Sequence, residues 1–503
     1  MNLRLLGLLL FLPIIMQAQL VSYSEPESDD ARRTDHEIIG RISGNILIFK
    51  NNRTDNAISI YGPDMKLLQR VALPFLPDKF ENVDFVQYPD FFYMLCEYQK
   101  RNIVHLVAFK LDKMAQVIGE PVELDTTQVN GSNNSKIYTN MYSEDKKYLM
   151  AVKINTKNPK NFVFTTFLFD KNLELVDRHR MPMTVQDRAD YFSNFEVDND
   201  GQLVFTRFAR MGSGDYLNHV AVVSKAPKAD TFSIRDIGAS DRILDELKLK
   251  VDNFNKRYLL SAFFYKQRKG NIEGLFTVIW DKSSDAKFSE AVTIFNDDLR
   301  ALAKSSESSE KMAFNDYFIK KIVTKKDGGY LLISEVEYTT TRGTSYNRSD
   351  YLYGPMNPND FNYSPYYNPY SPYSPYYRYG TGQATRYNAE NIMILSFDKN
   401  NNMEWSNVIP KSQFDDDGMN QISYQSMNTG GELHFLYNQV DKRTMLLMDQ
   451  SISADGKITR LPTFHNLDKG YVFLPRLAKQ VASNQIVIPC QYRNYLCFAK
   501  IDF

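Results

Sequence analysis

The chain has 503 residues, with 60 Lys and Arg against 60 Asp and Glu, so it carries no net charge at neutral pH. This balance excludes a general electrostatic attraction to nucleic acid or to an acidic surface, and no nucleic-acid partner is expected. Hydrophobic residues make up 43% of the chain, and 33 Phe and 32 Tyr against 2 Trp favour packed β-sheets.

Residues 1–18 have the pattern of a secretory signal peptide. Arg4 supplies the positive start, and Leu5 to Met16 is largely apolar. We expect cleavage after Ala18, because twelve residues are few for a membrane span, which needs about 20. An uncleaved anchor is the alternative. No cysteine near this site can carry a lipid, and no later stretch is apolar enough to span a membrane. The sequence therefore predicts a periplasmic or secreted protein.

From residue 19 onward, one hairpin recurs along the chain. An apolar strand ends in Asp-Lys or a variant, and a second strand follows. Two further strand patterns precede the hairpin, as in KIYTNMY and KKYLMAVKI ahead of FVFTTFLFDK. Four short antiparallel strands at a period of about 50 residues are typical of β-propeller blades. The copies lie at Asp64, Asp112, Asp170, Ser224, Asp281, Asp398, Asp449 and Asp502, in steps of 48, 58, 54, 57, 117, 51 and 53 residues.

Residues 19–503 are therefore predicted to form a single all-β domain, a β-propeller of eight four-stranded blades. A seven-bladed ring is the alternative. The last copy ends at Phe503, after its third strand, and Leu20–Tyr23 can supply the missing fourth strand. Closure of the ring in this way leaves no open sheet edge at the seam.

The step of double length contains a Tyr- and Pro-rich segment, which we expect to be a loop inserted at about residues 341–390. Six prolines between Pro355 and Pro375 exclude helix and sheet pairing over much of it. Repeated Pro-Tyr triplets favour polyproline II, and rows of tyrosines suit recognition surfaces. A disordered loop, an arm packed on its own propeller and an oligomer contact are the alternatives. The candidate binding residues are Tyr363, Tyr366, Tyr367, Tyr370, Tyr373, Tyr376 and Tyr377.

Around this insertion the chain reads Asp327-Gly328-Gly329, then Asp398-Lys399, Trp405 and Ile409-Pro410-Lys411. The pattern resembles one blade of uncharacterised secreted bacterial β-propeller proteins, in which an acidic-Gly-Gly turn precedes an apolar strand and a Tyr-rich loop. The resemblance covers about a fifth of the chain. It implies the propeller fold and no particular activity.

No pattern in the sequence identifies catalytic residues. A G-x-S-x-G elbow, a P-loop and a dinucleotide fingerprint are all missing. No metal site is expected, because no two histidines have a metal-ligand spacing, and we predict packed side chains for His105 and His434. No cofactor is expected either. Ca²⁺ at Asp198 and Asp200, or at 415–417, is the alternative to ordinary Asp-Gly turns. The histidines are His36, His105, His179, His219, His434 and His465.

Three cysteines exclude a disulfide scaffold. A two-residue turn at Arg493-Asn494 would place Cys490 and Cys497 opposite each other on a hairpin, at a Cα separation of about 5.5 Å that a disulfide can span. Two buried thiols are the alternative. Cys96 is expected to be a lone core thiol.

These observations favour a secreted, non-enzymatic propeller that binds a protein or glycan of the cell envelope through the Tyr/Pro-rich loop. A structural subunit of an envelope complex is one alternative. The other is a hydrolase or lyase that acts on an extracellular polymer at a mouth of the central channel. Buried polar groups with shifted pKa values at that mouth would favour the enzyme, and a channel plugged by apolar side chains would oppose it.

Overall fold

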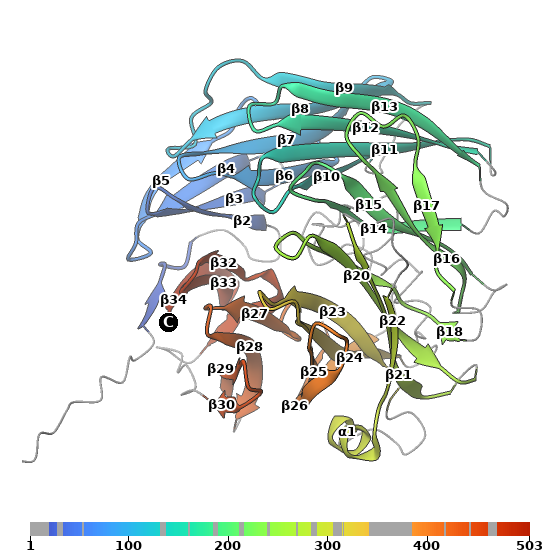
Figure 1. Ribbon diagram of the computed structural model, residues 1–503. Helices are drawn as coiled ribbons and strands as arrows, with labels where there is room; N and C mark the ends of the chain where they lie inside the picture. The colour runs from blue at the N-terminus through green and yellow to red at the C-terminus, as the bar shows by residue number, and fades with distance from the viewer. Residues whose placement is uncertain are drawn as a thin grey trace, which may run out of the picture.

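The computed structural model describes residues 20–27, 34–52, 55–130, 137–158, 161–184, 190–210, 216–238, 242–267, 270–282, 289–304, 314, 316–341, 385–416, 419–441, 444–460 and 470–503. In these ranges the protein is an eight-bladed β-propeller, as the repeat predicts (Figure 1). Each blade is an antiparallel sheet of four strands, and the innermost strand is divided in two in blades 5 and 8. The signal-peptide prediction for residues 1–18 lies outside the described residues.

The strands of each blade follow one another in the chain. Blade 1 is β2 (Asp35–Ile42), β3 (Asn45–Asn52), β4 (Asp55–Tyr61) and β5 (Leu67–Ala72), and blade 2 is β6 (Asn82–Gln87), β7 (Phe91–Lys100), β8 (Ile103–Asp112) and β9 (Val122–Gln128). Blade 3 is β10 (Tyr138–Tyr142), β11 (Tyr148–Asn158), β12 (Asn161–Asp170) and β13 (Leu175–Thr184), and blade 4 is β14 (Asp190–Val197), β15 (Leu203–Arg210), β16 (Leu217–Lys225) and β17 (Ser233–Asp236).

The second half of the ring repeats this order. Blade 5 is β18 (Ile243–Leu244), β19 (Lys248–Asp252), β20 (Arg257–Tyr265), β21 (Ile272–Asp281) and β22 (Ser289–Ile294), and helix α1 (Asp297–Ala303) follows it. Blade 6 is β23 (Tyr317–Thr324), β24 (Tyr330–Thr341), β25 (Thr385–Phe397) and β26 (Met403–Asp415). Blade 7 is β27 (Tyr424–Asn428), β28 (Glu432–Asp441), β29 (Thr444–Ser453) and β30 (Ile458–Arg460). Blade 8 is β31 (Tyr471–Phe473), the 3₁₀ turn η2 (Pro475–Leu477), β32 (Lys479–Ala482), β33 (Gln485–Tyr492) and β34 (Tyr495–Asp502).

The N-terminal strand closes the ring. β1 (Leu20–Tyr23) pairs antiparallel with β34, with Leu20 opposite Asp502 and Tyr23 opposite Ala499. Figure 1 shows β34 and the C-terminus beside the start of the coloured chain. The eighth blade is thus built from both ends of the protein, as the sequence predicts, and the sheet edge at the seam is paired.

The recurring Asp of the repeat shapes the turn between the third and fourth strands. One carboxylate oxygen of Asp112 accepts the N–H groups of Met114 and Gln116, each at 2.8 Å, and Ala115 takes a left-handed φ of 56°. Asp170 and Asp398 make the same pair of bonds in their own turns. The Asp is repeated because its side chain satisfies N–H groups that a tight turn leaves without strand partners.

The repeat predicts that a strand ends and a turn begins at Asp449, and for this copy the prediction is wrong. Asp449 lies inside β29, where both carboxylate oxygens contact His434 Nδ1, at 3.1 and 3.2 Å. The turn follows β29 and contains Gly456, with a φ of 84°. The residues LLMDQ, which include Asp449, match the repeat, but β29 continues past them to Ser453.

The hydrophobic core consists of eight separate clusters, one between each pair of neighbouring blades. β3 shows the pattern: Leu47 and Phe49 pack toward blade 2, whereas Ile46 and Ile48 pack toward blade 8. Successive side chains of a strand point to opposite faces, so each inner strand supplies two interfaces. The eight interfaces form a closed cycle, which rules out the seven-bladed alternative.

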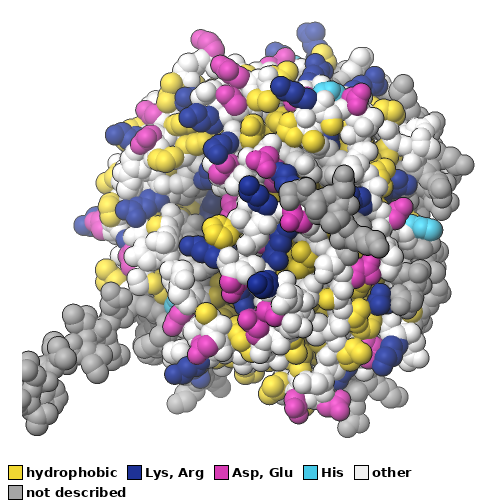
Figure 2. Space-filling model, viewed as in Figure 1, with side chains coloured by type: hydrophobic (Ala, Val, Ile, Leu, Met, Phe, Trp, Pro, Cys, Tyr) yellow, Lys and Arg dark blue, Asp and Glu magenta, His cyan; other side chains and the backbone are white. Residues whose placement is uncertain are grey.

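The innermost strands surround the propeller axis, and we call their half-buried polar side chains the axial wall. Its charged members include Glu37, Asp84, Glu196, Lys248, Lys320 and Lys479. Figure 2 shows Lys, Arg, Asp and Glu side chains gathered around the middle of the ring. Where the structure describes it, this wall is charged and is not an apolar plug. No helix in the described part of the chain is long and apolar enough to cross a membrane.

Candidate functional site

Blade 6 carries the Tyr/Pro-rich insertion on strands that are longer than those of other blades. β24 has 12 residues, and β25 and β26 have 13 each. Thr341 lies opposite Thr385, so residues 342–384 leave and re-enter the sheet at the same point. β24 ends at Thr341 and β25 begins at Thr385, so these two strands flank residues 342–384, within the predicted insertion at about 341–390. The candidate binding tyrosines, Tyr363 to Tyr377, lie outside the described residues.

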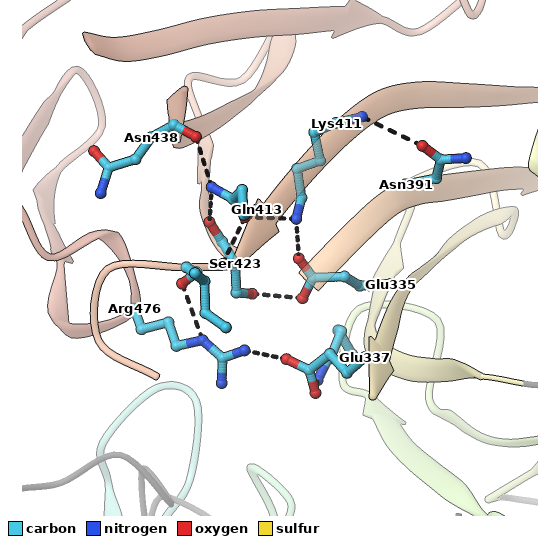
Figure 3. Close-up of polar contacts among 10 residues, drawn as sticks. Glu335, Glu337, Asn391, Lys411, Gln413, Ser423, Asn438 and Arg476 are labelled. Carbon is cyan, nitrogen blue, oxygen red and sulfur yellow. Dashed lines mark hydrogen bonds and ion pairs between the residues drawn. The ribbon is translucent and has the colours of Figure 1, made fainter. Parts of the chain in front are cut away.

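A buried ion pair lies in the same blade, six residues before β24 ends. Glu335 of β24 and Lys411 of β26 are 2.7 Å apart, with side chains 0% and 1% exposed. Ser423 donates its hydroxyl to Glu335 at 2.5 Å, and Lys411 donates to Gln413 Oε1 at 2.8 Å. Gln413 in turn donates to the Asn438 carbonyl oxygen at 2.7 Å. The chain of polar contacts runs from blade 6 into blade 7 (Figure 3).

A second ion pair continues this network into blade 8. Glu337, two residues after Glu335 on the same face of β24, pairs with Arg476 of η2, and both side chains are 3% exposed. Its other oxygen pairs with Lys320 of β23. The Nε atom of Arg476 donates to the Ile422 carbonyl oxygen at 3.0 Å. Figure 3 shows the carboxylates of Glu335 and Glu337 directed toward these partners.

Burial and pairing shift the pKa values in this network in opposite ways. Burial opposes the charge of Glu337, but Arg476 and Lys320 outweigh it, so the pKa of Glu337 falls from 4.5 to about 2. Burial lowers the pKa of Lys411, while the adjacent Glu335 works in the other direction. Glu337 is therefore a stable anion at neutral pH, held by two cations.

We call Glu335, Glu337, Lys411, Gln413, Ser423 and Arg476 the interblade network. Its carboxylates are engaged by cations and lie out of contact with solvent, so they cannot exchange protons with a substrate in this arrangement. The network instead joins blades 6, 7 and 8 with charge-assisted hydrogen bonds. It supplies a rigid support at the blade that carries the insertion.

The aspartates of the Ca²⁺ alternative are engaged by protein groups. Asp198 accepts the N–H groups of Asp200 and Gln202, each at 2.9 Å, which is the predicted turn. Lys282 lies 2.5 Å from both Asp198 and Asp200, so an ammonium group occupies the position between these carboxylates. Asp416 pairs with Arg386 at 2.7 and 2.9 Å, and Asp417 lies outside the described residues. Within the described ranges, no three His, Cys, Asp or Glu side chains are grouped so as to hold a metal ion.

Two histidines lie in strands, as predicted. His434 is buried in β28 against Asp449, whereas His105 is half-buried, with Nδ1 2.8 Å from Glu123. His105 also stacks on Tyr98. Each of these two rings is thus held by a carboxylate of its own sheet.

The two predicted hairpin cysteines are in register. Cys490 of β33 lies opposite Cys497 of β34, with Tyr492 and Tyr495 bounding the two-residue turn. Both side chains are fully buried, and their sulfur atoms lie 2.7 Å apart as thiols. Cys96 is buried in the core between blades 1 and 2, as expected.

Sequence reasoning did not identify the interblade network. Glu335 and Glu337 stand in LLISEVEY, where alternation of charged and apolar residues resembles an ordinary strand with one face in water. Lys411 belongs to the Ile-Pro-Lys motif of the family resemblance, but the motif gives it no role. The only signal in the sequence was the occurrence of charged residues inside the strands of blade 6.

Comparisons with known proteins find distantly similar solved structures. No protein-family model and no curated protein matches the sequence. Among solved structures, the polysaccharide lyase Uly1 is similar with a TM-score of 0.41 and 9% identity, over 83% of this chain and 89% of that one. Prolyl oligopeptidase B from Galerina marginata has a TM-score of 0.41 and 7% identity over 92% of this chain, which spans only 56% of that enzyme. The propeller domain of the trilobed protease from Pyrococcus furiosus has a TM-score of 0.35 and 10% identity, over 85% and 98% of the two chains. At such values the similarity says nothing about the chemistry of this chain.

Proposed function

We propose that the protein is an exported, non-enzymatic propeller that binds a protein or glycan of the cell envelope through the tyrosines of its blade 6 insertion. The observation that carries this proposal is the pairing of Thr341 with Thr385. Both ends of the insertion are anchored in one sheet, which is itself joined to blades 7 and 8 by the interblade network.

A binding role suits this arrangement better than catalysis. The buried carboxylates of the network are already paired with cations, so they are unavailable as acid and base. A recognition segment, by contrast, gains from a rigid base, because the support loses little entropy when a ligand binds. Tyrosine adds apolar area and a hydroxyl with few rotatable bonds.

The test is a pull-down from cell-envelope extracts with three proteins. One is the mature protein, the second has residues 351–379 replaced by a Gly/Ser linker, and the third has Tyr495 changed to Ser. Tyr495 is 45% exposed on the hairpin of blade 8 and serves as a matched surface control. Circular dichroism confirms that all three fold.

We expect a protein or glycan that the mature protein and Tyr495→Ser retain and the linker variant loses. Equal retention by all three proteins, or retention by none, would overturn the proposal. Export is checked separately: the protein isolated from cells is expected to begin after Ala18.

A further inference from the structure

The imidazole ring of His36 is buried at the seam of the ring of blades. His36 lies in β2 with 7% of its surface exposed, and neither of its ring nitrogens has a hydrogen-bond partner in the described part of the chain. The ring packs edge-on against Phe498 of β34, with ring centroids 5.5 Å apart. Protonation of such a ring is unfavourable, because a buried charge without a partner is costly.

The residue directly opposite His36 is a buried cation. His36 pairs with Lys50 in the register of β2 and β3, so both side chains lie on one face of the sheet, where the Cβ atoms of opposite residues are about 5 Å apart. The side chain of Lys50 is 0% exposed, and its Nζ atom lies 5.3 Å from the centroid of the same Phe498 ring. A proton on His36 would therefore place two positive charges directly opposite each other, which destabilises a sheet.

The carboxylate on this face of the sheet is already engaged. Glu27 pairs with Lys50 and accepts a hydrogen bond from Tyr61, and Arg70 of β5 lies 3.8 Å from it. One carboxylate thus faces three polar partners, two of them cations. Successive side chains of a strand point to opposite faces, so the acidic neighbours of His36 in β2 are directed away from this face. These neighbours are Asp35 and Glu37.

The proton affinity of His36 agrees with this geometry. Burial lowers its pKa from 6.5 to about 4, the charge of Lys50 acts in the same direction, and the backbone of Thr34 has a smaller opposite effect. Where the ring meets water instead, its pKa returns to about 6.5. An open seam therefore binds a proton more tightly than a closed one. Opening is favoured as the pH falls from 6.5 to 4, whereas above about pH 6.5 the ring does not influence the seam.

We call residues 20–27 the closing segment, and few bonds hold it in place. β1 has only four residues and pairs with one strand, β34. Beyond β1, Ser24 donates its N–H to the Phe498 carbonyl oxygen at 2.8 Å, and Glu27 donates its N–H to the Leu496 carbonyl oxygen at 3.0 Å. A short terminal strand with one neighbour opens at a lower free energy than the inner strands of a blade. The closing segment also carries Glu27, the countercharge of Lys50.

We propose that His36 and Lys50 form an acid-sensitive switch, in which protonation of His36 releases the closing segment from blade 8 while the other blades stay folded. The proton adds to a ring nitrogen, and the two cations then share Glu27 as their carboxylate. Release of the segment admits water to both cations and leaves the edge of β34 unpaired. The switch is independent of the proposed function, because it uses no residue of the insertion.

The test is hydrogen exchange of the purified mature protein, measured by mass spectrometry. Peptides from the closing segment report on the seam, and peptides from the buried strand β20 in blade 5 report on the ring as a whole. Exchange is measured from about pH 7 to about pH 4, corrected for the intrinsic rate at each pH, without urea and in low urea. The variants are His36→Leu and His36→Gln, and His219→Gln, at an exposed histidine, is the control.

We expect the protection of the closing segment to fall on the order of 100-fold from about pH 7 to about pH 4, because opening restores the ordinary proton affinity of His36. At each pH this protection should be lower than that of β20 and should respond little to low urea, since release of one segment exposes little surface. Both His36 variants should lose most of the fall with pH, even where they weaken the seam at every pH. The control should behave like the mature protein.

Three results would overturn the proposal. Equal protection of the closing segment and β20, with equal sensitivity to urea, would show that acid unfolds the ring as a whole. An equal fall in the two His36 variants and the control would assign the opening to another group. Constant protection of the closing segment in the mature protein down to about pH 4 would show that the seam does not respond to acid.

Discussion

Lys50 of β3 and Glu27, four residues beyond β1, form an ion pair with an Nζ–Oε1 distance of 2.5 Å, and the side chain of Lys50 is completely buried. The hydroxyl of Tyr61 donates to the same carboxylate and accepts from Lys50 at 2.9 Å. Lys50 belongs to blade 1, whereas the segment that carries Glu27 completes blade 8. The pair therefore joins the closing segment to the first blade across the seam of the ring.

Glu27→Gln should lower the free energy of unfolding by about 3 kcal/mol, because it leaves the ammonium group of Lys50 buried without a countercharge. Urea denaturation followed by circular dichroism measures the change. Glu25→Gln is the matched control, since Glu25 is exposed two residues earlier. Equal effects of the two substitutions would show that the seam does not depend on this pair.

Lys411→Met should cost about 3–5 kcal/mol, since Glu335 then remains buried and charged. The double variant Glu335→Leu/Lys411→Met should recover most of that loss, because replacing both partners removes the unpaired charge. Lys399→Met, at an exposed turn of the same blade, is the control. The quantity to measure is the coupling energy of the double-mutant cycle in chemical denaturation. Additive effects would contradict a direct interaction between Glu335 and Lys411.

His36 should make the protein less stable in mild acid. Burial, with the charge of Lys50 added, lowers the pKa of His36 from 6.5 to about 4. The unfolded chain therefore binds more protons between these two values, so this contribution to stability is intact above about pH 6.5 and lost as the pH falls to 4. The loss is about 3 kcal/mol.

The measurement for His36 is the free energy of unfolding as a function of pH. His36→Gln should flatten its slope between pH 4 and 6.5, even where the substitution lowers stability at every pH. His219→Gln, at an exposed histidine, should leave the slope unchanged. A slope that survives in His36→Gln would assign the acid sensitivity to other groups.

If the protein is exported as proposed, Cys490 and Cys497 should form a disulfide, because they are directly opposite on neighbouring strands and an extracytoplasmic compartment is oxidising. Alkylation of the denatured protein without reductant should then modify only Cys96, as judged by mass spectrometry. After reduction all three cysteines should react. Three modified cysteines without reductant would show that the pair persists as buried thiols.

Local chemistry explains why the blades could be predicted from the sequence. Asp112, Asp170 and Asp398 each satisfy N–H groups of their own turn within four residues, so the turn is encoded where it forms. Pairing between β1 and β34 also follows from local pattern, since a terminal blade short of one strand requires a strand from the other end. The Tyr-rich insertion falls between β24 and β25, two strands that the repeat also predicts.

The interblade network was decided only by tertiary structure. Glu337 and Arg476 are 139 residues apart, and Lys321 meets Ser426 across a blade interface, so no local spacing predicts either contact. Strand periodicity assigns a charged residue to the solvent side, whereas here the side chain turns to a partner supplied by another blade. The sequence by itself thus determined the blades and most of their turns, because these depend on neighbours in the chain, and the closure of the ring, because a last blade short of one strand requires a strand from the other end. Which charges are paired or buried depends on neighbours in space, and only the assembled ring decided that.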